Sequence, residues 1–94
     1  MAGCGAPFGP LHRYLYLTAP DPQWQDQIIW RESTWVPGAT NPRSGAAGLA
    51  QFLRTTWLWG QERFGLWGSP YDPYMNIAMM NAFIRAGEYY HWNL

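Results

Sequence analysis

Two Asp-Pro pairs, Asp21-Pro22 and Asp72-Pro73, constrain the fold of this 94-residue chain more than any other feature. An Asp side chain can cap the free N–H groups of a helix's first turn. A Pro is tolerated at the first helical position, where its missing N–H leaves no bond unmade. The pairs therefore predict one helix from residue 21 and another from residue 72. The first should run through QWQDQIIWRES and end near Trp35, because a Pro-Gly pair follows shortly after.

The stretch RTTWLWGQERF predicts another helix, with Thr55 or Thr56 as its cap and Gly65 at its end. No segment alternates between apolar and polar residues as a strand does, so we expect a mainly α fold with a loop or short irregular ribbon at 36–50. In the last helix, one buried face is marked by residues at spacings of three and four: Ile77, Met80, Ile84 and Gly87.

The length indicates one domain, which we assign to residues 21–94. Residues 1–20 are rich in Gly, Pro and aromatic residues, and we expect an extended arm that packs on this domain or is partly disordered. A short chain buries a thin core. The seven Trp, six Tyr and four Phe can compensate, since each aromatic buries ~150–250 Å². Seven Trp exceed what such a core needs, so some should line a groove.

The charge pattern excludes several function classes. The net charge is zero and the six basic residues are Arg residues spread along the chain, whereas nucleic-acid binding needs a basic patch. The single Cys4 cannot form an intrachain disulfide, and His12 and His91 stand alone, so no metal site and no cofactor is expected. No run of ~18 apolar residues could span a membrane, and no signal peptide is evident.

Glu32 stands at the head of a loop rich in Gly, Pro, Ser and Asn, and the next acid along the chain is Glu62. At about 100° per residue, Glu32 falls on the apolar stripe of its helix, together with Gln25, Ile28 and Ile29. We therefore expect its carboxyl to emerge from the inward face, at the helix's C-terminal end. Burial and the negative end of the helix dipole both disfavour a carboxylate anion. A carboxyl that keeps its proton can serve as a general acid.

The stretch RESTWVPGATNPRSGAAGLAQF, from residue 31, resembles the soluble lytic transglycosylase (SLT) domain of the goose-lysozyme-like superfamily. In that family a Glu-Ser pair ends a helix, a loop with Asn, Pro and Ser-Gly-Ala follows, and Gly-Leu-Met-Gln closes it. Glu32-Ser33, Ser44-Gly45-Ala46 and Gly48-Leu49-Ala50-Gln51 match these places. TTW at 55–57 and DPYMNI at 72–77 resemble later landmarks, so the resemblance covers residues 24 to about 92. It is similar in particular to compact versions found in phage tail and lysis proteins.

The resemblance implies a lysozyme-like helical domain that cleaves the β-1,4 bond between N-acetylmuramic acid and N-acetylglucosamine in peptidoglycan. Glu32 would take the place of the catalytic acid, Ser33 that of the Ser that supports the loop, and Gln51 that of a glycan-contacting Gln. In the family a loop Ser touches the sugar's N-acetyl group. Because the loop carries one extra residue here, Asn41 and Ser44 are both candidates for that contact.

Two departures from the family pattern affect the predicted site. Ala50 replaces the Met of Gly-Leu-Met-Gln, so one apolar wall of the groove should be thinner. The family's Ala-Tyr-Asn motif, whose Tyr sits by the catalytic acid, is absent. Tyr90, or its neighbour Tyr89, is the candidate to replace that Tyr, and a surface or packing role for either is an equal alternative.

The acids of the chain decide between mechanisms. Most glycosidases place two carboxylates ~5–9.5 Å apart. Asp26 lies about 120° around the helix from Glu32, which leaves Glu62 as the second candidate. We expect instead that the substrate's own acetamido group takes the second role and that attack by its C6 hydroxyl leaves a 1,6-anhydro end. The alternatives are a lysozyme-type hydrolase of the same bond and a non-catalytic glycan-binding or phage tail module.

The expected partners are peptidoglycan glycan strands, with no nucleic acid and no membrane span. We expect a monomer or a part of a larger virion or secreted assembly. Its place would be extracellular, periplasmic or virion-associated.

Overall fold

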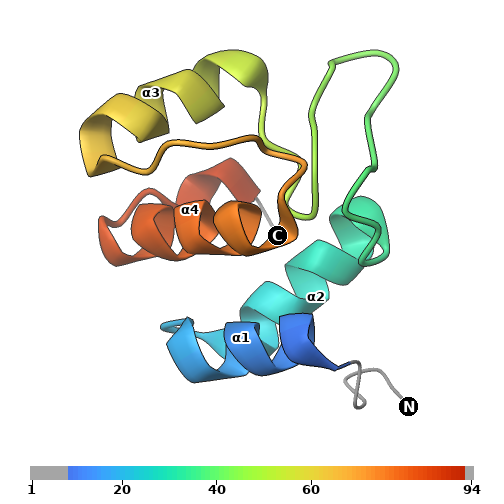
Figure 1. Cartoon of the computed structure of the whole chain (residues 1–94), viewed down its shortest axis with the longest axis vertical. Coiled ribbons are helices and arrows are strands. Elements are labelled where there is room, and N and C mark those ends of the chain that lie inside the picture. Colours follow the sequence, from blue (N-terminus) through green and yellow to red (C-terminus); the bar gives the residue numbers. More distant parts are fainter. Residues whose placement is uncertain (1–8, 93–94) are drawn as a thin grey trace.

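Four α-helices and one short 3₁₀ helix form the regular structure of residues 9–92, the part of the chain that this computed structural model describes (Figure 1). Helix α4 packs against α1 and α3, and α1 packs against α2. No strand forms within residues 9–92, so the expected mainly α fold is confirmed. The elements are α1 (Pro10–Thr18), α2 (Pro22–Ser33), α3 (Arg54–Phe64), α4 (Pro73–Arg85) and η1 (Tyr89–Trp92).

Both Asp-Pro pairs begin helices, as predicted. The Asp21 side chain accepts from the N–H three residues on at 3.5 Å, and Asp72 accepts from the N–H groups two and three residues on at 3.0 and 3.2 Å. The prediction for the start of α3 is wrong, because Leu53 is its N-cap residue and no side chain caps it. Gly65 ends α3 as expected, with a φ of 70° that Gly adopts at little cost.

The expectation of an extended arm is wrong for Pro10–Thr18, which forms α1. Pro10 stands at the helix's start, where its missing N–H is tolerated. The inner side of α1 buries His12 and Leu15. Gly9 is the N-cap residue, Pro10 opens the helix and Pro20 follows it, so no Gly or Pro interrupts its interior. Residues 1–8, including Cys4, lie outside the described residues.

Phe83 of α4 is the centre of an aromatic cluster. Its side chain is fully buried, and its ring centroid lies 5.3 Å from that of Phe52, 5.4 Å from Phe64 and 5.5 Å from Trp59. Trp92 of η1 completes the cluster at 6.2 Å. Rings supplied by α3, α4, η1 and the end of the long loop therefore meet at one residue, which is how this short chain forms a core.

The buried face predicted for α4 is confirmed in part. Ile77 and Met80 are buried and Ile84 is partly buried. Gly87 lies beyond the helix, with a φ of 82°, and does not belong to the face. The face is wider than the spacing indicated, because α4 also buries Asn76, Met79, Asn81 and Phe83.

Buried amides tie three helices together. Gln25 of α2 donates through Nε2 to Oδ1 of Asn81 on α4 at 2.7 Å, and Asn81 donates through Nδ2 to the Thr18 hydroxyl at 2.9 Å. Arg85 donates to the Thr18 carbonyl as well. Buried amides without partners are costly, so these bonds fix the end of α1 and the middle of α2 against α4.

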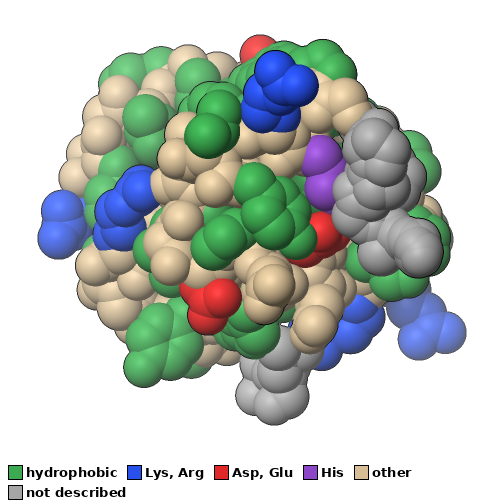
Figure 2. All heavy atoms as spheres, turned by 90° about the horizontal axis from the view of Figure 1, so that it is seen from below, with side chains coloured by type: hydrophobic (Ala, Val, Ile, Leu, Met, Phe, Trp, Pro, Cys, Tyr) green, Lys and Arg blue, Asp and Glu red, His purple; other side chains and the backbone are tan. Residues whose placement is uncertain are grey.

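On the face drawn in Figure 2, the Arg side chains are spread around the edges and form no single basic patch. Among the helices of residues 9–92, none combines the length and apolar character that a membrane crossing requires.

Replacing Phe83 with Ala should lower the free energy of unfolding by about 3–5 kcal/mol, because the cluster would be left with a cavity at its centre. Leu58→Ala is the control, since Leu58 is exposed on α3, and it should change stability by less than about 0.5 kcal/mol. Chemical denaturation of both variants measures the difference. A similar loss for the two variants would contradict the central place given to Phe83.

Candidate functional site

Glu32 lies in the last turn of α2 as an exposed residue whose side chain is 32 % accessible, so the expected burial is wrong. The buried position of this last turn is taken by Ser33. Glu32 Oε2 lies 3.3 Å from Arg31 Nη2, in an ion pair between two solvent-accessible side chains. The earlier part of the apolar stripe is buried as predicted: Gln25, Ile28 and Ile29. The stripe is thus covered only up to the final turn, and Glu32 lies beyond its buried part.

Ser33 faces inward. Its hydroxyl donates to the Ile29 carbonyl at 3.1 Å within the same helix, and its side chain is buried. Its backbone carbonyl accepts from the Thr34 hydroxyl at 2.6 Å and from the Val36 N–H at 3.1 Å. Ser33 therefore holds the start of the loop through its carbonyl, while its side chain is turned away from solvent.

The chain leaves α2 through two residues in the left-handed region. Thr34 has a φ of 51° and Trp35 a φ of 61°. Residues other than Gly adopt this region at a cost of about 1–3 kcal/mol and keep it only when their surroundings hold them there. The sharp reversal after Glu32-Ser33 is therefore held by tertiary contacts.

Asp26 provides the main contact that holds this reversal. Its Oδ1 accepts from the Trp35 indole Nε1 at 2.8 Å. Its Oδ2 accepts from the Tyr16 hydroxyl at 2.8 Å and lies 3.2 Å from His12 Nε2. The His12 ring also stacks on that of Trp35, with centroids 4.0 Å apart. Asp26 thus joins α1, α2 and the first residues of the loop.

The tip of the loop is built by Asn41 and Ser44, both exposed. Asn41 Oδ1 accepts from the N–H groups of Arg43 and Ser44 at 2.8 and 3.3 Å, and the Ser44 hydroxyl accepts from the Ala46 N–H at 3.2 Å. Two isolated bridges, Thr40–Ala47 and Ala47–Phe52, are the irregular ribbon of this region. Both candidate side chains therefore shape the turn that presents them to solvent.

Gln51 uses its amide donors inside the loop. Its Nε2 donates to the carbonyls of Ala39 and Gly48 at 3.1 and 2.9 Å, and its backbone has a φ of 55°. The side chain therefore links the two ends of the loop, and the group that remains for a substrate is its carbonyl oxygen.

Asn76 of α4 anchors the base of the loop, a role that residue spacing does not predict. Its Oδ1 accepts from the Ala50 N–H at 2.9 Å and its Nδ2 donates to the Pro70 carbonyl at 2.8 Å. Gly48 lies against this contact, and a Cβ there would overlap the Pro70 carbonyl oxygen and the Asn76 amide. The segment DPYMNI, recognised as a landmark, was the signal that pointed to Asn76.

Tyr90 lies in a different place from the loop. Its hydroxyl donates to Glu88 Oε1 at 2.7 Å, and this bond, with smaller contributions from desolvation and from the Glu88 charge, raises the pKa of the Tyr90 phenol above its usual value. Tyr90 lines a small pocket of about 200 Å³ with residues from the start of α3 and the C-terminal segment. Its neighbour Tyr89 is the one that contacts α2, with its ring centroid 6.4 Å from that of Trp24.

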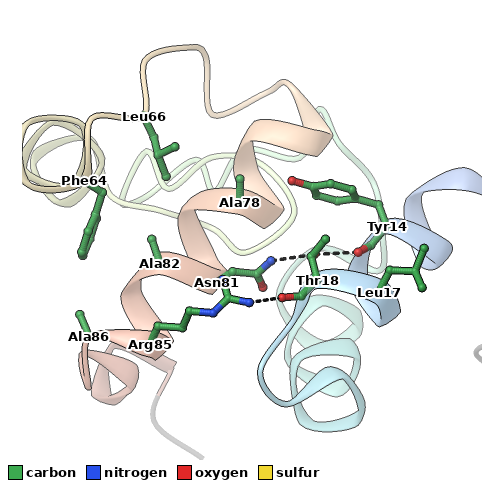
Figure 3. A pocket seen from close by; sticks show the side chains of 10 residues that line it. All are labelled: Tyr14, Leu17, Thr18, Phe64, Leu66, Ala78, Asn81, Ala82, Arg85 and Ala86. Atoms are coloured by element: carbon green, nitrogen blue, oxygen red, sulfur yellow. Dashed lines mark hydrogen bonds between the residues drawn. The ribbon is translucent and has the colours of Figure 1, made fainter.

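A groove of about 790 Å³ lies away from the predicted site residues (Figure 3). Its walls come from the end of α1, one side of α4 and the end of α3 with Leu66 after it, and Arg85 and Asn81 point toward Thr18 across it. None of Glu32, Ser33, Asn41, Ser44, Gln51 or Tyr90 lines it.

The aromatic residues near the loop are mostly core. Phe52 and Trp57 are 3 % and 4 % exposed, so neither can stack on a sugar, while Trp35 is partly buried against the core. Exposed rings occur elsewhere, with Trp30 on α2 and Trp67 after α3 both more than half exposed. Within residues 9–92, no three His, Cys, Asp or Glu side chains gather as a metal site would require.

Comparison with protein families places the chain. A family model described as "Transglycosylase SLT domain" matches residues 19–88, and the chain belongs to this family. The match includes α2, the long loop, α3 and α4, and it begins after α1. Comparisons with curated proteins and with solved structures gave no match.

Replacing Gly48 with Ala should destabilise the fold by more than about 1 kcal/mol, because the φ of 83° is strained for Ala and the site has no room for a Cβ. Gly45→Ala is a matched control, since Gly45 has a φ of 77° but open space around it. Thermal unfolding of both variants separates the two effects. Equal losses would mean that backbone conformation alone, and not the contact with Asn76 and Pro70, requires the Gly.

Proposed function

We propose that this protein is a peptidoglycan lytic transglycosylase in which Glu32 is the single catalytic carboxylate. Membership of the transglycosylase SLT family supports peptidoglycan as the substrate. The observation that carries the residue assignment is the position of Glu32, exposed in the last turn of α2 at the entry to the long loop. The Glu-Ser pair and the closing Gly-Leu-Ala-Gln stand on either side of that loop, and they resemble the family's Glu-Ser and Gly-Leu-Met-Gln apart from Ala50.

In the proposed reaction, Glu32 first acts as an acid and then as a base. Its carboxyl proton passes to the glycosidic oxygen as the bond from that oxygen to C1 of N-acetylmuramic acid breaks. The substrate's acetamido oxygen stabilises the positive charge at C1. The C6 hydroxyl oxygen then bonds to C1, and its proton returns to the Glu32 carboxylate. The products are a 1,6-anhydro end and a free hydroxyl on the departing N-acetylglucosamine, with no water consumed.

The occupation of the other acids supports a mechanism with one carboxylate. The chain holds six acids. Asp21 and Asp72 cap helices, and Asp26 accepts from Trp35 and Tyr16. Glu88 accepts from Tyr90. Glu62 is exposed on α3 and remains the candidate for a second carboxylate in a lysozyme-type hydrolase. The C6 hydroxyl of the same sugar has a large advantage in effective concentration over water.

The proposed substrate-binding roles follow from the polar groups of each side chain that are not used in hydrogen bonds within the protein. Asn41 and Ser44 present side chains at the loop tip, where either can meet the acetamido group of a sugar. Gln51 offers its carbonyl oxygen, while Ser33 holds the loop. Tyr90 would contact the bound glycan strand if that strand extends to the start of α3. Because peptidoglycan lies outside the cytoplasm, we place the protein there, as a secreted, periplasmic or virion-associated unit.

Glu32→Gln should lower turnover of purified peptidoglycan by about 10²–10⁴-fold, because an amide cannot deliver the proton. Stability should change little, since the Arg31–Glu32 pair is exposed. Glu62→Gln is the matched control, also on an exposed helical position, and it should keep full activity. Release of soluble fragments measures turnover. If Glu32→Gln retains a tenth of the activity, Glu32 is not the acid.

The products of the wild-type protein separate the alternatives. Muropeptides from a digest, weighed by mass spectrometry, should carry 1,6-anhydro ends, lighter by one water than reducing ends. Reducing ends as the main product, together with loss of activity in Glu62→Gln, would establish a hydrolase with two carboxylates. Binding to peptidoglycan without release of fragments would establish a non-catalytic glycan-binding module.

A further inference from the structure

We propose that Asp26 is a positioning residue for Glu32, and that α1 is part of the catalytic unit because it holds Asp26 in place. The inference rests on the proposed function. It adds residues to the site that lie before the span matched by the family model, since His12 and Tyr16 precede residue 19.

The geometry begins at the reversal after Ser33. Trp35 is three residues beyond Glu32, and its side chain folds back along α2 to reach Asp26. Asp26 is seven residues before the end of α2 at Ser33, about 10 Å along the helix axis. Because the hydrogen bond from Trp35 reaches this far back along α2, it fixes the direction in which the chain leaves the helix. The last turn, which carries Glu32, and the first residues of the loop are fixed together.

The two carboxyl oxygens of Asp26 contact different parts of the fold, one the loop and the other α1. Oδ1 accepts from Trp35, and Oδ2 accepts from Tyr16 and lies within bonding distance of His12, both on α1. Asp26 is 8 % exposed and His12 6 %. Hydrogen bonds to a carboxylate are roughly twice as strong as those between neutral groups. The contacts of α1 with Oδ2 hold the Asp26 carboxylate in the position where Oδ1 accepts from Trp35.

Backbone strain at the reversal makes the support necessary. Thr34 and Trp35 both keep positive φ without being Gly, so the relaxed chain would choose another path. The Asp26 bond and the His12 stacking at 4.0 Å hold Trp35 in the strained path. Without them, Glu32 would remain in the sequence but lose its fixed relation to the loop.

Trp35→Phe tests the proposal in the full-length chain. Phe keeps a ring against His12 but cannot donate to Asp26. We expect kcat on soluble, uncross-linked glycan strands to fall by about tenfold or more, since a displacement of 1 Å can cost about 10²-fold, while KM changes by less than about twofold. Trp57→Phe is the matched control, because Trp57 also loses an indole bond, to the Gly68 carbonyl at 3.0 Å, without touching the reversal.

A second pair of variants tests the role of α1. Tyr16→Phe removes one donor to Asp26, and Tyr14→Phe, on the same helix, removes a hydroxyl that does not contact Asp26. We expect Tyr16→Phe to lower kcat several-fold and to speed hydrogen exchange at the Trp35 indole N–H, whose NMR signal is identified by its loss in Trp35→Phe. Tyr14→Phe should leave both unchanged.

The outcomes are distinct. If Trp35→Phe keeps kcat within about twofold of wild type, or if Trp57→Phe loses as much activity at an equal loss of stability, the network is structural only and the proposal is wrong. If the indole N–H exchanges at the same rate in Tyr16→Phe, α1 does not hold Asp26. If wild type and Glu32→Gln release equally little product, the proposed function itself fails, and this inference fails with it.

Discussion

The segment between α2 and α3 contains only two isolated bridges as regular pairing, so its backbone polar groups need partners that a sheet or helix would otherwise supply. Leaving such a group buried and unpaired costs about 1–3 kcal/mol. Backbone bonds within the loop meet part of this need. Two side-chain amides meet another part: Asn76 joins the Ala50 N–H to the Pro70 carbonyl, and Gln51 links Gly48 to Ala39. A carboxamide suits this work because it both donates and accepts. The shape of the candidate site depends on these amides.

Helix α4 contacts the loop, α1 and α2 and orients them relative to one another. Its Asn76 holds the loop, its Phe83 centres the aromatic cluster, and its Asn81 binds Gln25 of α2 and Thr18 of α1. Three separate contacts along one helix therefore fix α1, α2 and the loop in a common frame. A chain of this length has little core to spare, and specific polar bonds supply orientation that apolar packing alone does not.

The features that sequence predicted well are local. Asp21 and Asp72 cap helices through bonds to N–H groups within three residues, and Gly65 ends α3 through its own φ, so each signal is complete within a few residues. Glu32 was misplaced because the helical stripe describes direction but not how far the core extends along the helix. No role is predicted for Asp26, which lies about 120° around the helix from Glu32. Its partners are 9 to 14 residues away in the sequence and lie on other elements, so residue spacing does not predict them.

The exposure of Glu32 bears on how the proposed mechanism would operate. A buried carboxyl would be prepared for acid catalysis before the substrate arrives, whereas the Glu32 side chain is 32 % accessible to solvent and pairs with Arg31. On the proposed function, the glycan strand would cover Glu32 and displace water from it, so the substrate would supply the low-dielectric surroundings in which a proton donor is effective. The protein's own contribution would then be placement. On that proposal, the bonds around the loop, from Asn76 to Asp26, would serve to fix backbone direction and would not enclose the carboxyl.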